Sequence, residues 1–217
     1  AVTWNISNVG AVAGVMGDGY GVSLAAVGLL TTALFATHLV VQIPGGRLID
    51  RVGARGVGLA ALSVVATGNA SALIDPSLGV GLAGRIVMGV GTGAGFVAGI
   101  DLVRAGKGGP FWQGAYGGAT MAAGGLALMV VPQLVGGLGW RAPYWTGLAL
   151  AVLAVLPVLA ARAERVAHHP DAHEALGRGV LRDRRLWPLG AVHVATFGLS
   201  VVAGNWIVTL LEHQGHG

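Results

Sequence analysis

Long apolar runs separated by short polar breaks extend along the whole sequence. Seven runs can be delimited, approximately Val2 to Gly17, Val22 to Pro44, Gly56 to Ile74, Leu78 to Val103, Phe111 to Leu138, Pro143 to Ala161 and Trp187 to Leu211. A hydrocarbon core about 30 Å thick needs roughly 20 apolar residues per helix. The runs are long and do not alternate as the strands of a membrane barrel would. We therefore predict seven transmembrane helices.

The composition supports a membrane protein and excludes several other classes. Hydrophobic residues make up 54% of the chain and charged residues 10%, whereas soluble domains carry about 25% charged residues. There is no cysteine, which excludes disulfides and thiolate metal sites. The basic residues are not gathered on a soluble face with aromatics between them, so we expect no nucleic-acid partner. The predicted fold class is all-α and integral to a lipid bilayer.

The positions of the charges predict the topology. Basic residues follow the second, fourth and sixth runs, whereas Arg141 is the only basic residue in the breaks after the first, third and fifth. By the positive-inside rule, the even-numbered ends are cytoplasmic. We expect a multi-pass protein of the cell membrane, inner or plasma, with a cytoplasmic N-terminus and helix seven ending outside.

The spacing of the runs predicts two units. Residues 1–161 form a six-helix domain, 162–186 a polar cytoplasmic linker, and 187–217 the seventh helix, which starts a second unit. The first run has no cytoplasmic leader before it, so we expect its helix to be truncated. The remainder of the second unit is then an expected partner from the same protein.

The segment "GGRLIDRVGAR", residues 45 to 55, is the most specific motif. We expect the second helix to end at Pro44, the glycines to form a turn, and the third helix to begin near Gly56. Anchoring of a cytoplasmic loop explains the arginines but neither Asp50 nor the spaced glycines. The pattern Gly46-x-Leu48-x-Asp50-Arg51-x-Gly53-x-Arg55 resembles the loop between helices two and three of the major facilitator superfamily. Ala54 stands where that family usually has a basic residue.

The resemblance implies a secondary transporter that works by alternating access. Its fold would be the family's six-helix bundle of 3+3 inverted repeats, followed by the first helix of the second half, with substrate bound near the midplane. The sequence is similar to the cyanate and nitrate porter branches, which favours a small anionic solute; coupling to protons, and symport or antiport, stay open. The alternative is a sensor or scaffold with the same fold. No paired nucleophile and base lies in the spans, so we predict neither an enzyme nor a cofactor or metal site.

The resemblance also implies a conformational latch at the inner end. In the family, the loop carboxylate is held against a helix N-terminus of the other half, and nearby basic residues pair with an acid on helix four. The acid here would be Asp101, although Asp101 can equally form a simple i,i+3 pair with Arg104. The expected latch residues are Gly46, Asp50, Arg51, Gly53, Arg55, Asp101 and Arg104.

Polar residues inside the spans are the candidates for a substrate or proton pathway. Arg85 is costly in lipid, so it should face a water-filled interior or a partner, unless it snorkels to the outer interface. With Gly89 and Gly91 it resembles the family's helix-four arginine, which in proton-coupled members is associated with coupling or substrate charge. The other candidates can also be helix–helix hydrogen bonds; they are Asn5 and Asn8 on one face of the first helix, His38, Tyr116 and Thr120.

Overall fold

The computed structural model describes residues 1–106, 109–161 and 183–214, apart from some side chains of the last helix. Within these ranges the chain is helical and contains no strand. Three stretches are long and apolar enough to cross a membrane by length and composition alone: Leu24–Val52, Leu78–Ala105 and Pro110–Ala160. The described chain therefore has the all-α architecture of an integral membrane protein. We call its ends inner and outer after the predicted topology.

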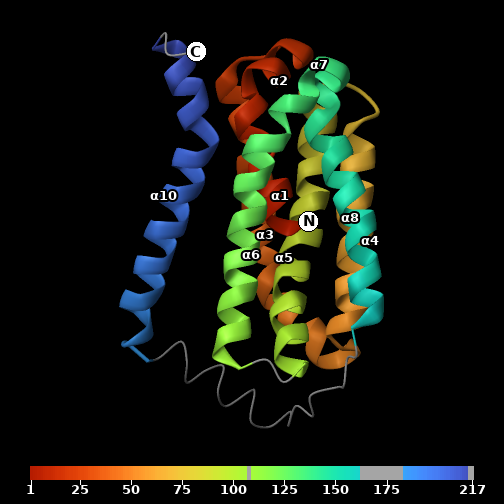
Figure 1. Cartoon of the computed structure of the whole chain (residues 1–217), viewed down its shortest axis with the longest axis vertical. Helices are drawn as coiled ribbons and strands as arrows, with labels where there is room; N and C mark the ends of the chain where they lie inside the picture. Colours follow the sequence, from red (N-terminus) through yellow and green to blue (C-terminus); the bar gives the residue numbers. More distant parts are fainter. Residues whose placement is uncertain (107–108, 162–182, 215–217) are drawn as a thin grey trace.

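The helices run side by side along the long axis of the molecule (Figure 1). The first span comprises α1 (Val2–Ser7), the 3-10 turn η1 (Gly10–Val12) and α2 (Ala13–Tyr20). Next come α3 (Leu24–Val52), α4 (Ala54–Ala72), α5 (Leu78–Ala105) and α6 (Pro110–Val130). The outer connection contains η2 (Pro132–Leu134), α7 (Val135–Leu138) and η3 (Gly139–Arg141), and is followed by α8 (Ala142–Ala160) and α10 (Leu186–His213).

Helix α5 lies at the centre of the packing. It packs against α3 and α4, while α4 also contacts α8, and α1 contacts α6. The crossing of α4 and α5 depends on two glycines, because a Cβ at Gly68 or Gly84 would lie only 2.8 Å from the other's carbonyl oxygen. Small residues of this kind let transmembrane helices approach closely. The tight crossing fixes the depth at which the polar residues of α4 and α5 meet.

The second helix does not end at Pro44, so that prediction is wrong. Helix α3 continues through Pro44 to Val52, and Gly53 alone separates it from α4. A proline in a transmembrane helix is tolerated where neighbouring groups re-satisfy the backbone. Gly45 does not form a turn either; it lies inside the helix, where a Cβ would be 3.3 Å from Ala94 Cα. The turn is at Gly53, with φ 86° and ψ 150°, a region open essentially to glycine alone.

Two other predicted spans differ in detail. The first span is interrupted between Ser7 and Gly10 instead of forming one helix. The fifth ends at Val130 instead of Leu138, directly before the Val131–Pro132 pair, since Pro132 has no backbone N–H to continue the helical hydrogen bonds. Residues 162–182 of the predicted linker, 162–186, lie outside the described residues, and helix seven begins at Leu186.

Candidate functional site

Arg85 lies in the interior of the bundle, fully buried on α5. Its Nη1 donates to the backbone oxygen of Asn5 at 2.5 Å, and its Nη2 to Asn8 Oδ1 at 3.1 Å. The guanidinium carbon also lies 5.3 Å from the ring centroid of Tyr144, within the range of a cation–π contact. Arg85 therefore does not reach the outer interface by snorkelling, and its contacts are with neutral groups.

The break in the first span provides one of these contacts. Helix α1 ends at Ser7, and the 3-10 turn begins at Gly10. Carbonyls in the last turn of a helix lack partners within the helix and need another donor. The Asn5 carbonyl finds this donor in Arg85. The break in the first span thus lies where the Arg85 guanidinium is buried.

Asn8 and Asn69 tie the surrounding helices to this point. Asn8 Nδ2 donates to the Pro143 carbonyl at the start of α8, at 2.7 Å. Asn69 Nδ2, on α4, donates to Asn5 Oδ1 at 2.9 Å and to its own helix at Val65. We call the residues Asn5, Asn8, Asn69 and Arg85 the buried amide–arginine network. All four side chains are fully buried.

Two atoms of the network have no hydrogen-bond partner among the described residues. They are Arg85 Nε and Asn69 Oδ1. Buried polar atoms without a partner are uncommon and require an explanation. The carboxylates at the outer end of the chain, Asp18 and Asp75, are exposed, and no described carboxylate forms an ion pair with Arg85. No described carboxylate therefore compensates the positive charge of Arg85.

Aromatic residues cover the outer side of the network. The Tyr144 hydroxyl lies 2.9 Å from that of Tyr20 on α2, and Trp140 packs edge-on against both rings, at centroid distances of 5.4 and 6.3 Å. Arg141 in turn lies over the Trp140 ring. Together they separate the buried arginine from the outer surface.

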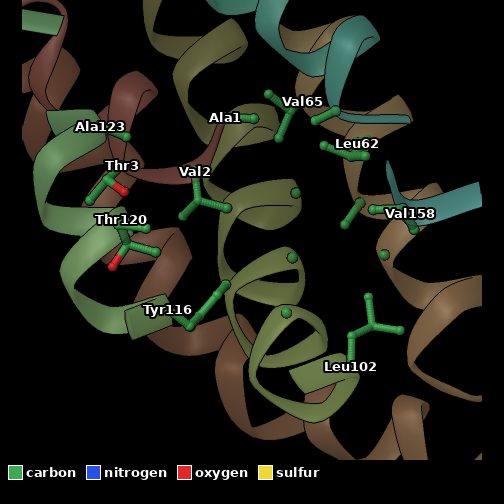
Figure 2. A pocket seen from close by; sticks show the side chains of 17 residues that line it. Ala1, Val2, Thr3, Leu62, Val65, Leu102, Tyr116, Thr120, Ala123 and Val158 are labelled. Carbon is green, nitrogen blue, oxygen red and sulfur yellow. The ribbon is translucent and has the colours of Figure 1, made fainter. Parts of the chain in front are cut away.

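A pocket of about 260 Å³ lies inward of the network (Figure 2). Its direction follows from three helices, because Thr3 precedes Asn5 on α1, Val65 precedes Asn69 on α4, and Gly91 follows Arg85 on α5. The walls are mostly apolar. Hydroxyl groups come from Thr3, Tyr116 and Thr120, so two of the predicted pathway residues lie on this pocket.

His38 lies elsewhere, at the contact between α3 and α5. Its side chain is buried, and Nδ1 is 3.1 Å from Thr92 Oγ1. The ring packs against Phe35 and Phe96. Tyr116 packs on the far side of Phe96 and donates to its carbonyl at 3.2 Å. His38 is thus a helix–helix contact that reaches the pocket only through aromatic neighbours.

The predicted latch residues lie together at the inner end. Asp50, Arg51 and Arg55 are exposed on either side of Gly53, and Gly46 is half-buried on the last turns of α3. Asp101 is half-buried and Arg104 exposed, both on the last turns of α5.

The sequence alone indicated Arg85, Asn5 and Asn8 but not all of their partners. Asn69 and Tyr144 were missed. The signal for Asn69 is an amide in the middle of an apolar run, which is costly in a membrane without a partner. Tyr144 carries no comparable signal, because aromatic residues are common near membrane interfaces.

Comparison with known proteins gives a family match over the whole chain. The family model described as Major Facilitator Superfamily matches residues 1–217. No curated protein matches the chain significantly.

Proposed function

Because this chain belongs to the major facilitator superfamily, a family of membrane transporters, we propose that it moves a small anion across the cell membrane by alternating access. The observation that carries the proposal is the fully buried Arg85, whose contacts are two amide oxygens and an aromatic ring. A charge in the membrane interior is a functional feature by default.

The energetics of Arg85 favour an anionic solute. Moving a charge out of water costs several kcal/mol even after relaxation of the protein, and buried arginines are normally compensated by a carboxylate. Here the partners are neutral, so a bound anion would supply the missing negative charge. Guanidinium groups suit planar oxyanions, because their donors form a rigid fork. Nitrate fits this description, and the similarity of the sequence to the cyanate and nitrate porter branches makes nitrate and cyanate the first solutes to test.

The pocket and the inner residues complete the proposal. The pocket begins about one helical turn inward of the network, whose own residues do not line it, and carries the hydroxyls of Thr3, Tyr116 and Thr120 on its wall. The other half of the same protein would close the substrate site from the opposite side. Asp50 and Arg55 would contact that half from the inner end, which we propose is cytoplasmic. Protons are the coupling ion to test first.

The proposal is tested with protein from the complete reading frame in proteoliposomes. Uptake is measured with nitrate, cyanate, formate and phosphate, and with choline and glucose as non-anionic controls. Arg85→Gln removes the charge but keeps hydrogen-bonding atoms, and we expect it to abolish anion uptake. Expression and monodispersity are measured in parallel.

Arg141→Gln is the matched control. Arg141 is exposed at the outer end and stacks on Trp140, so its loss should leave anion uptake nearly unchanged. Absence of uptake with every anion, or uptake that survives Arg85→Gln, would contradict the proposal. A sensor or scaffold would show no solute uptake at all.

A further inference from the structure

The amide of Asn8 has only one possible orientation. Its two hydrogen-bond partners are the Pro143 carbonyl, which can only accept, and the Arg85 guanidinium, which can only donate. The nitrogen must therefore face Pro143 and the oxygen must face Arg85, as the distances of 2.7 and 3.1 Å show. Asn8 thus links the start of α8 to the buried cation.

An aspartate would fit the same space with the opposite consequence. Asparagine and aspartate have nearly the same shape, and a carboxylate facing a guanidinium forms the stronger, charge-assisted bond. Such a pair would cancel the charge of Arg85 within the protein. Asn5 differs, because its backbone oxygen accepts from Arg85 while its Oδ1 accepts from Asn69. The side chain of Asn8 is thus the neutral amide that faces the arginine where a carboxylate would neutralise it.

We propose that Asn8 is a positioning residue that determines the charge specificity of transport. It holds Arg85 by a hydrogen bond and leaves its charge uncompensated, so that the anionic solute provides the counter-charge. This inference rests on the proposed anion transport. It adds that selectivity depends on the neutrality of a residue that acts through Arg85.

The test compares two substitutions that differ in charge. Asn8→Asp introduces a carboxylate, while Asn8→Ser keeps a neutral oxygen; both remove the amide nitrogen that donates to Pro143. At the few ångströms that separate these groups, a unit charge in protein changes affinity by on the order of tenfold to a hundredfold. We expect the half-saturating nitrate concentration of Asn8→Asp to exceed that of Asn8→Ser by at least about tenfold, because only the aspartate compensates the charge of Arg85.

The measurement is nitrate uptake into proteoliposomes, with another anion from the same panel substituted if it is taken up faster. Half-saturating concentration and maximal uptake rate are determined separately, because a purely structural role would lower the amount of active protein and hence the maximal rate alone. If Asn8→Asp does not yield folded protein, Asn5→Asp takes its place. That substitution keeps the acceptor for Asn69 and the bond from Asn8 to Pro143 and loses the donor to Ala1 O. Its carboxylate lies on the residue whose backbone oxygen holds Arg85, so a rise in the same direction is expected.

The outcomes separate the two proposals. No anion uptake by the unaltered protein overturns the proposed function. Normal anion uptake combined with equal half-saturating concentrations in the aspartate and serine variants overturns the role of Asn8 and leaves anion transport standing. An equal rise in both variants also overturns it, because the lost bond to Pro143 would then be the cause.

Discussion

Gly68→Ala places a methyl group at the crossing of α4 and α5. A Cβ there would lie 2.7 Å from Met88 Cγ and 2.8 Å from both Gly84 O and Met88 N, whereas ordinary contacts are 3.4–4 Å. Two of the three atoms belong to the backbone, so the helices must separate by about half an ångström or more. Overpacking of this kind costs about 1–3 kcal/mol, and replacing a helical glycine by alanine returns about 0.5–1 kcal/mol. We expect a net loss of about 1 to 2 kcal/mol.

The assay is thermal unfolding in detergent, followed by the fraction of monodisperse protein. Gly56→Ala is the matched control, because Gly56 lies on the same helix and a Cβ there would meet nothing within 4 Å. The control should be as stable as the unaltered protein or slightly more so. Equal unfolding temperatures for the two variants would refute the close crossing. Since Gly68 and Gly84 adjoin Asn69 and Arg85 in sequence, Gly68→Ala should also weaken transport.

Three further substitutions test separate parts of the structure. Tyr144→Phe removes the hydroxyl contact with Tyr20 and keeps the ring beside the guanidinium; thermal unfolding should show a loss of about 1 kcal/mol, and the half-saturating nitrate concentration should not change. His38→Phe removes the bond to Thr92, which still donates to a backbone carbonyl; stability should fall, while the response of uptake to an imposed pH gradient should persist. Asp50→Asn alters an exposed residue, so stability should stay within about 0.5 kcal/mol. Uptake normalised to expression should nevertheless fall, because the proposed latch loses its charge.

The sequence was informative where the position of a residue depends on the free-energy cost of exposing it to lipid. An arginine within an apolar run cannot face lipid without a large penalty, so an interior position for Arg85 could be predicted from the run alone. The spacing of three residues predicted that Asn5 and Asn8 share one face of the first helix, and both contact Arg85.

The sequence was uninformative where the outcome depends on packing between distant segments. Asn69 meets Asn5 across 64 residues of chain, and this pairing follows from the depth at which α4 crosses its neighbours. Pro44 misled because its local effect is to end helices, whereas the membrane environment favours continuing the helix so that backbone groups stay paired. A prediction based on neighbouring residues does not include this effect of the membrane on the helix.

Because Gly53 alone connects α3 to α4, the two helices are coupled at their inner ends. Consecutive Cα atoms are only about 3.8 Å apart, so the inner end of α3 cannot shift far without pulling α4 along. The segment around Asp50 is therefore part of a tight junction between two helices and not of a long loop. A displacement of Asp50 would therefore also move the start of α4, the helix that carries Asn69, whose side chain bonds to Asn5 beside Arg85.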